Sequence, residues 1–120
     1  MALTACGGGL SDEEKAIAGN YYIPEVSDAL PLIELHPDGT SVMRAIRPQV
    51  LTYAVEGTWH IDSDSLIIIN DLSSIEVDGD ETLIGDISAR SAHAIASKTD
   101  LTLSLVHDGG VIYEYHRRKN

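Results

Sequence analysis

Residues 53–70, YAVEGTWHIDSDSLIIIN, constrain this chain more than any other stretch. Apolar and polar residues alternate from 51 to 62, and a period of two with one apolar face is typical of a half-buried β-strand. Residues 62–65 are Asp and Ser, whose short side chains bond their own backbone and favour a turn. The Ile-rich run that follows predicts a second strand. We therefore expect one long hairpin here.

Similar short runs with a period of two recur along the rest of the chain. They predict strands at 19–23, 32–36, 40–47, 72–77, 82–96, 101–107 and 111–117. The strand 82–96 is long and rich in small residues, so we expect a bend near Gly85 or Ser91. Leu101, Leu103, Leu105 and the alternate residues of 111–115 are expected to face inward.

The fold class follows from the number of strands and the short turns between them. Eight or nine antiparallel strands in a meander favour an all-β, up-and-down β-barrel, because closure removes exposed strand edges. A short helix is expected before the first strand: Ser11 is a good N-cap, Glu14 completes a capping box, and Gly19 can end the helix. At 120 residues the chain is expected to form one domain.

Composition excludes several classes of function. Eight basic residues against nineteen acidic ones give a net charge of −11, which disfavours nucleic acid as a partner. A single cysteine rules out an internal disulfide. No stretch approaches the roughly 20 apolar residues of a membrane-spanning helix.

The sequence Leu3-Thr4-Ala5-Cys6 resembles a lipobox, the site at which bacterial lipoprotein precursors are acylated and cleaved. The resemblance implies lipid attachment at Cys6, with 1–10 as lipobox and glycine tether and 11–120 as the barrel domain. It also implies a bacterial cell-envelope protein held to a membrane by that anchor. Gly7 after the cysteine favours the outer membrane, on its periplasmic or surface face. The alternative is a free thiol in a chance match.

Five short motifs, taken in order, are similar to the lipocalin-like domain of small bacterial lipoproteins. They are Gly19-Asn20-Tyr21, Asp38-Gly39-Thr40, Gly57-Thr58-Trp59, Asp64-Ser65-Leu66 and Tyr115-His116-Arg117. The similarity covers about residues 11–118. It departs from the family at Tyr21, where Trp is usual. It implies the barrel fold and the envelope location, and little chemistry.

Nothing in the sequence points to catalysis. The five histidines do not stand at metal-ligand spacings, and no Gly-x-Ser-x-Gly elbow or phosphate-binding glycine loop occurs. The acidic clusters at 62–64 and 78–81 lack the remaining ligands of a calcium loop and are interpreted as turns. We therefore expect a protein that is not an enzyme, with no catalytic residue, metal or cofactor.

The lead hypothesis is a cavity that binds a small, largely apolar ligand. Alternation places four aromatic side chains opposite the small residues of 89–96, and these would line the cavity: Tyr53, Trp59, Tyr113 and Tyr115. Arg44 or His93 would meet a polar head group. In the competing interpretation Met43 and Ala45 face inward, Arg44 lies in water, and His93 is a satisfied core group.

The second hypothesis belongs to another class of protein. The chain would be an envelope interaction module with a solid core, and its loops at 24–31 and 70–82 would bind a protein or a glycan.

Overall fold

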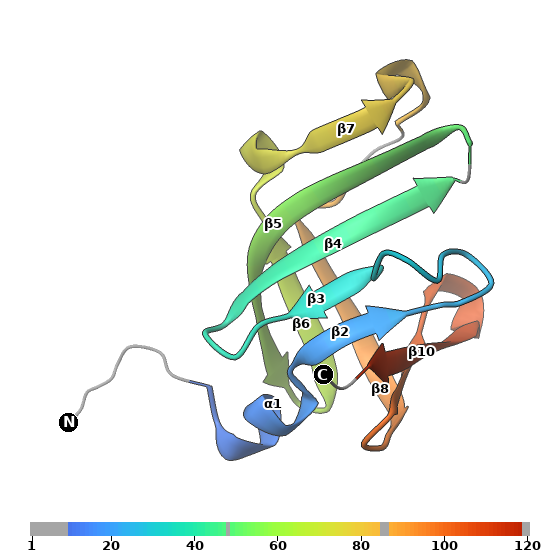
Figure 1. The fold of residues 1–120 in the computed structure, drawn as a ribbon. Helices are drawn as coiled ribbons and strands as arrows, with labels where there is room; N and C mark the ends of the chain where they lie inside the picture. The colour runs from blue at the N-terminus through green and yellow to red at the C-terminus, as the bar shows by residue number, and fades with distance from the viewer. Residues whose placement is uncertain (1–9, 48, 85–86, 119–120) are drawn as a thin grey trace.

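The chain folds into a closed, eight-stranded antiparallel β-barrel with one additional strand, in a computed structural model that describes residues 10–47, 49–84 and 87–118 (Figure 1). The barrel strands are β2 Gly19–Tyr22, β3 Ile33–Leu35, β4 Thr40–Arg47, β5 Leu51–Asp62, β6 Ser65–Asn70, β8 Arg90–Lys98, β9 Thr102–Val106 and β10 Ile112–Arg118. Each pairs with the next barrel strand along the chain, and β10 closes the barrel on β2. The predicted all-β barrel with one short helix is confirmed.

One end of the barrel, which we call the base, carries helix α1 Asp12–Ile17 and the turns at 36–39, 63–64 and 99–101 (Figure 1). The predicted capping box is present: Glu14 N donates to Ser11 Oγ at 3.1 Å, and Ser11 N to the Glu14 carboxylate at 2.8 Å. The other carboxylate oxygen of Glu14 accepts from Ile61 N at 2.7 Å. The cap therefore also ties α1 to the end of β5.

The hydrophobic core lies at this closed end. Its buried residues come from α1 and six of the strands: Ile17, Tyr21, Ile33, Leu35, Trp59, Leu66, Ile68, Leu103, Leu105 and Tyr115. Tyr21 Oη donates to Ile17 O at 2.5 Å, and Trp59 Nε1 donates to His36 O at 2.9 Å. Both buried polar tips are thus satisfied, as buried aromatic side chains require.

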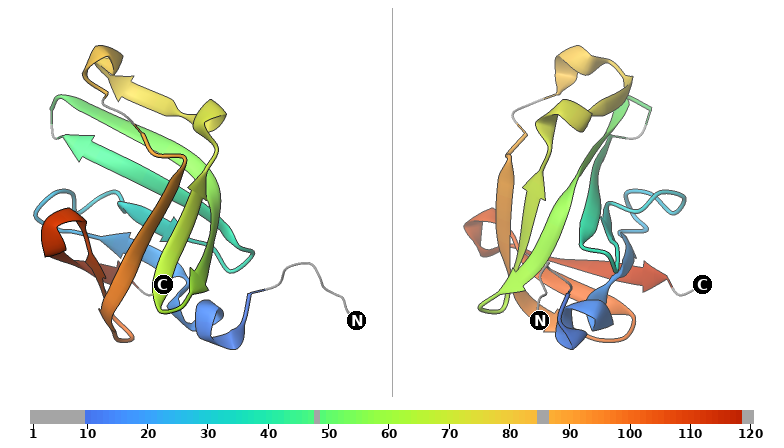
Figure 2. Two further views of the ribbon diagram at one scale, coloured as in Figure 1. Left: turned by 180° about the vertical axis from the view of Figure 1, so that it is seen from behind. Right: turned by 90° about the vertical axis from the view of Figure 1, so that its left-hand side faces the viewer.

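The opposite end, which we call the mouth, is formed by the β4–β5 turn, strand β7 Glu76–Gly79 and the β9–β10 turn (Figures 1 and 2). β5 is long enough to pair with two strands in succession on the same edge. Its second half pairs with β6, and its first half, from 51 to 54, pairs with β7. The 3₁₀ turn η1 Leu72–Ser74 bulges out between β6 and β7. A hydrogen bond from Asp71 N to Glu56 O, 2.7 Å long, holds it against β5.

Two of the predicted strands are wrong in part. Residues 72–77 do not form one strand, because η1 occupies the first three and β7 starts at Glu76. Residues 82–96 do not form one strand either: η2 Glu81–Leu83 precedes a crossing segment, and β8 starts only at Arg90. Gly85 lies outside the described residues. The irregularity of β8 falls between Ile95 and Ser97.

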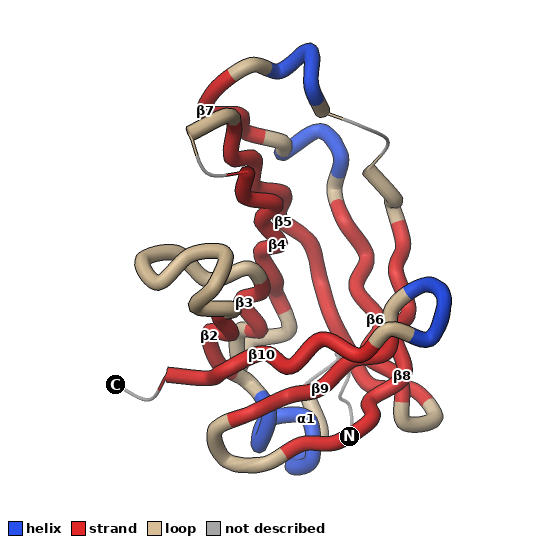
Figure 3. Tube along the Cα trace, turned by 90° about the vertical axis from the view of Figure 1, so that its right-hand side faces the viewer, coloured by secondary structure: helices blue, strands red, loops and turns tan. Residues whose placement is uncertain are grey.

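β8 starts only at Arg90, and β7 at the mouth lies outside the closed ring of eight strands. Among the described residues β7 pairs only with β5, so the side of β7 away from β5 has no strand partner. Figure 3 shows η2 and β7 standing beyond the ends of β6 and β8. Leu101 and Val111, which were expected to face inward, lie at strand ends and are exposed. The strands enclose a packed core at the base and an open interior at the mouth.

Candidate ligand-binding cavity

A cavity of about 440 Å³ lies inside the barrel at the mouth. Its lining comes from inward positions on the strands and from the segment that crosses to β8: Met43, Ala45, Tyr53, Val55, Asn70, Ile87, Ser88, Ser91, His93 and His107, with Arg44 at its edge. The pairing register explains the set, because Met43 opposes Val55 and Ala45 opposes Tyr53 across β4 and β5. Alternation puts these four on the same face as the core residues below them.

Asn70 is the polar residue most deeply placed in this lining, with 9 % of its surface exposed. It ends β6 at the parity of Leu66 and Ile68, both of which are in the core. Its Nδ2 donates to Ser88 O at 3.0 Å and approaches Met43 Sδ at 3.8 Å. A carbonyl oxygen only accepts, so this contact fixes the orientation of the amide.

The amide oxygen of Asn70 has no hydrogen-bond partner in the described part of the chain, although the atom is buried. The Oγ atom of Ser91, another lining residue, is likewise buried and unpartnered among the described residues. Such groups are rare in folded proteins, because each unsatisfied buried acceptor costs about 1–3 kcal/mol. A third buried atom of this kind, Ser41 Oγ, does not line the cavity.

A row of aromatic rings forms one side of the mouth. His93 stacks on His107 with ring centroids 4.4 Å apart, and His107 stacks on Tyr113 at 4.2 Å. The Nδ1 atom of His93 is 3.0 Å from Val106 O, a carbonyl that can only accept, so Nδ1 carries the proton. In the neutral ring Nε2 of His93 is then an acceptor.

Tyr115 supports this row from the core side. Its hydroxyl lies 3.1 Å from His107 Nε2, and the residue is 5 % exposed. Burial, with a smaller contribution from the neighbouring Tyr113, raises the pKa of Tyr115 to about 12. The hydroxyl therefore stays protonated at neutral pH.

Arg44 does not point into the cavity. Its guanidinium pairs with the Glu34 carboxylate and donates to Pro31 O at 3.3 Å, on the outer face of β3 and β4. Burial raises the pKa of Glu34, but the hydrogen bonds and charges of His36 and Arg44 outweigh that effect and hold it below its ordinary value. The inward position considered for Arg44 is wrong. Met43 and Ala45 face inward instead, and Arg44 is ion-paired rather than free in water.

The other sequence-predicted residues fall at different depths. Tyr53 and His93 line the cavity as expected. Trp59 and Tyr115 face inward but lie in the packed core, so neither lines the cavity. Tyr113 is 45 % exposed and lines a neighbouring groove.

Two lining residues were missed by the sequence analysis although a signal was present. Asn70 is a polar residue at the end of the inward series Leu66, Ile68, Asn70. His107 extends the inward series Leu103, Leu105 by one more step. Both are polar residues at alternate positions that are otherwise apolar and face inward. This pattern marks them, because a buried polar group usually has a specific partner or function.

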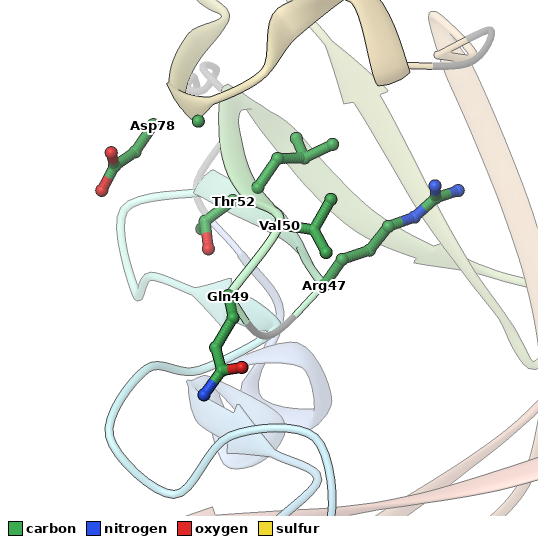
Figure 4. A pocket seen from close by; sticks show the side chains of 7 residues that line it. Arg47, Gln49, Val50, Thr52 and Asp78 are labelled. Atoms are coloured by element: carbon green, nitrogen blue, oxygen red, sulfur yellow. The ribbon is translucent and has the colours of Figure 1, made fainter.

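A smaller hollow of about 280 Å³ lies outside the barrel, between the β4–β5 turn and β7 (Figure 4). Figure 4 shows the side chains of Arg47, Gln49 and Asp78 pointing in different directions, with Arg47 and Asp78 on opposite sides. Their polar groups do not converge on one point. This hollow is therefore a weaker candidate than the cavity inside the barrel, where Asn70, Ser91 and His93 gather.

A third hollow, a groove of about 420 Å³, runs between the loop after β2 and strand β10. Ile23, Val26 and Tyr113 contribute its apolar surface. Figure 2 shows the loop between β2 and β3 standing out from the barrel wall. The loop at 24–31 named by the second hypothesis thus borders a real depression.

Within residues 10–47, 49–84 and 87–118, no three His, Cys, Asp or Glu side chains come close enough together to hold a metal ion. The same residues contain no helix with the length and apolar character needed to cross a membrane. Cys6, the predicted lipid-attachment site, lies outside the described residues.

Comparison of the chain with protein-family models, with curated proteins and with solved structures found no match.

Proposed function

We propose that this protein is a lipid-anchored binding protein of the bacterial cell envelope, not an enzyme, that holds a small ligand in the cavity at the mouth of its barrel. The observation that carries the proposal is the cavity at the mouth, whose lining combines apolar side chains such as Met43 and Val55 with the imidazole ring of His93. The volume, about 440 Å³, lies in the usual range for small-molecule sites.

The architecture supports the same proposal. Barrels of eight strands are about wide enough to hold one small ligand inside. The order of the G-x-aromatic and Asp-Gly motifs, which resembles lipocalin-like lipoproteins, adds a fold known for holding ligands in this way.

The envelope location rests on the sequence around Cys6. The pattern Leu3-Thr4-Ala5-Cys6 and the glycines at 7–9 support acylation and a flexible tether. The intact mass of protein extracted from membranes tests this part. A mass increased by a diacylglyceryl group, and lost in Cys6→Ser, is expected; an unmodified thiol in the membrane fraction would contradict it.

Native mass spectrometry, beside the denatured mass, tests ligand binding. We expect a non-covalent adduct of a few hundred daltons that disappears on denaturation. Ala45→Phe places a ring in the cavity and should abolish the adduct. Ala54→Phe is the matched control, because Ala54 pairs with Arg44 and lies at the outward parity of β5. An adduct that survives Ala45→Phe would place the ligand elsewhere.

The second candidate is the interaction module, and the groove beside the loop at 24–31 favours it. That groove is lined by Ile23, Val26 and the exposed Tyr113, outside the barrel. Capture of one stoichiometric envelope protein or glycan, lost in Val26→Asp and kept in Ala45→Phe, would select this function. The reverse pattern would select the cavity.

A further inference from the structure

Strand β10 has a free edge beside the groove that it forms with the loop at 24–31. Resting on the second candidate function above, and independently of the cavity, we infer that this edge binds an extended segment of a partner protein with alternating apolar and basic side chains. The segment pairs with β10 as an added strand. The strand pairing, the lining of the groove and its charges each point to such a partner.

The free edge results from the unequal lengths of the two neighbours of β10. β9 pairs with residues 112–116, whereas β2 pairs only with residues 116–118. β2 ends at Tyr22 because Pro24 follows and the chain then turns, with Val26 N donating to Ile23 O at 2.8 Å. In the described part of the chain no strand therefore pairs with residues 112–115 on this side.

The hydrogen-bonding pattern shows which backbone groups this edge presents. On the opposite edge Arg117 N donates to Leu101 O at 2.7 Å, so residues of the same parity as Arg117 bond to β9. The N–H and C=O groups of Ile112 and Glu114 therefore point away from β9, toward the groove. Within the described residues these four groups have no hydrogen-bond partner. An added strand can bond all four.

The side chains of the groove set the apolar character of the partner. Ile23 and Val26 form its wall on the loop, and Tyr113 contributes from β10 with 45 % of its surface exposed. The neighbouring Ile112 is 57 % exposed. Exposed apolar residues that lie together in this way are typical of interaction sites. Apolar side chains of an added strand would cover them.

The charge of the groove sets the sign of the partner. Its lining contains Glu25, Glu114 and His116, and no Lys or Arg. His116 Nε2 lies 3.3 Å from the Glu114 carboxylate, so the two carboxylates leave the lining negative whether or not His116 is protonated. Arg118, at the outward parity of Glu114, is paired with Asp28. A basic side chain opposite Glu114 is therefore favoured in the added strand.

A second copy of this chain is a poorer occupant of the same edge. Two β10 edges paired with each other would bring the two Glu114 carboxylates onto one face, where like charges are unfavourable. The net charge of −11 on each chain adds long-range repulsion. A basic segment is instead attracted by both.

Three peptides test the inference on the full chain, by NMR titration and by the exchange rates of its backbone amides. They are acetyl-VKVKV-amide, its acidic counterpart acetyl-VEVEV-amide, and the first peptide with N-methyl groups on the backbone nitrogens of both lysines, which cannot donate to β10. We expect only the first peptide to slow exchange at Ile112 and Glu114, and to bind about tenfold more tightly than the others. Equal binding of the three, or unchanged exchange at those two amides, would overturn the inference.

Variants assign the effect to the edge. Ile112→Pro removes one donor that does not face β9, at the first residue of a strand, where proline is tolerated, and should weaken the lysine peptide about fivefold. Glu25→Gln and Glu114→Gln should each weaken it about threefold. Glu76→Gln, on β7, is the control of equal charge change and should have no effect. If Ile112→Pro does not fold, the two glutamine variants decide, and unchanged affinity in both would contradict the inference.

Failure of this inference and failure of the interaction module give different results. Capture of an envelope partner that is lost in Val26→Asp, without binding of any of the three peptides, would overturn the added basic strand and leave the module in place. Binding of the lysine peptide that is lost in Val26→Asp would support both.

Discussion

The base and the mouth are built from the same strands but closed in different ways. At the base, α1 and three turns cover the core, and Tyr21, Trp59 and Glu14 each bond a backbone group across an element boundary. At the mouth, β5 changes partner, β8 starts late, and the inward side chains surround a cavity. The packed side chains at the base give the barrel its hydrophobic core, so the side chains at the mouth do not have to be packed as tightly.

The largest loss should come from Gly57, at the middle of β5, where it pairs with Asn70 of β6 between the two ends. A Cβ atom there would lie 2.0 Å from Ile69 O, and backbone cannot move aside without separating the strands. We expect Gly57→Ala to cost about 4 kcal/mol or more in urea unfolding followed by Trp59 fluorescence. Gly109→Ala, in open space at the mouth with φ +78°, should cost about 1 kcal/mol. Equal losses would refute this account of Gly57.

A second pair of variants compares apolar truncations at the two ends. Leu66 is fully buried in the core, whereas Met43 lines the cavity. Leu66→Ala should cost about 3 kcal/mol, because it opens a new void in packed surroundings, and Met43→Ala about 1 kcal/mol, because it enlarges an existing one. The free energies of unfolding from denaturant titration decide the matter. A larger loss for Met43→Ala would mean that the mouth is as well packed as the base.

The fold could be predicted where the determinants are local. The hairpin of β5 and β6 follows from alternation and from an Asp-Ser turn in which Ser63 and Asp64 take positive φ. The helix is predicted by Ser11 and Glu14, which stand three residues apart and form the capping box. These signals are complete within a few residues, so no knowledge of the barrel is needed.

The crossing from β7 to β8 could not be predicted in the same way, although it carries a local signal. Asp71 accepts from Ser73 N and Oγ, and Asp80 accepts from Thr82 N and Oγ1, as Asp38 does from Thr40. The cluster at 78–81 was interpreted as a turn, whereas the Asp-x-Ser pattern at 71–73 was overlooked. Where the chain goes after such a turn depends on which edge of β5 is free, and that is a property of the assembled sheet.

For the candidate site, the sequence predicted which residues face the barrel interior, but not how far along the barrel each of them lies. Alternation placed Tyr53, Trp59 and His93 on the inner face, and all three face inward. It could not tell which of them meets the cavity, because depth is set by strand tilt and by where the core ends. Arg44 was ambiguous since the apolar residues on both of its sides allow either register of β4.

The base also depends on one polar residue, Arg117. Its guanidinium donates to Ala16 O at 2.7 Å, Ala18 O at 3.2 Å, and twice to Asp100 O, so it joins α1, the β8–β9 turn and β10. We expect Arg117→Ala to cost about 2 kcal/mol, with little recovery in Arg117→Lys, because one ammonium cannot reach all three carbonyls in fixed geometry. Arg47→Ala, an exposed arginine at the mouth, is the control and should be nearly neutral. Full rescue by lysine would contradict the geometric explanation.

The boundary between the two ends lies at Tyr115, and alkaline pH probes it. Its pKa in the folded protein, about 12, is above the ordinary value of 10, so the unfolded chain loses this proton first as the pH rises. Stability is therefore full below pH 10 and falls between pH 10 and 12, by up to about 1.4 kcal/mol per pH unit. Tyr115→Phe should flatten this fall, and Tyr53→Phe, in the cavity, should not. The same slope in wild type and Tyr115→Phe would show that other groups control the alkaline limit.

The smallest effect is expected on the outer wall, at the Glu34–Arg44 pair. The folded protein lowers the pKa of Glu34 below its ordinary 4.5, so its contribution to stability is present above pH 4.5 and is lost as the pH falls through the lowered value. Solvent screens this half-buried pair, and the contribution should be under about 1 kcal/mol. Glu34→Gln should therefore flatten the acid side of the stability profile slightly, and Glu25→Gln, on an exposed loop, should leave it unchanged. A loss in Glu34→Gln as large as that of Leu66→Ala would mean that the outer ion pair, rather than the packed base, holds β3 and β4 together.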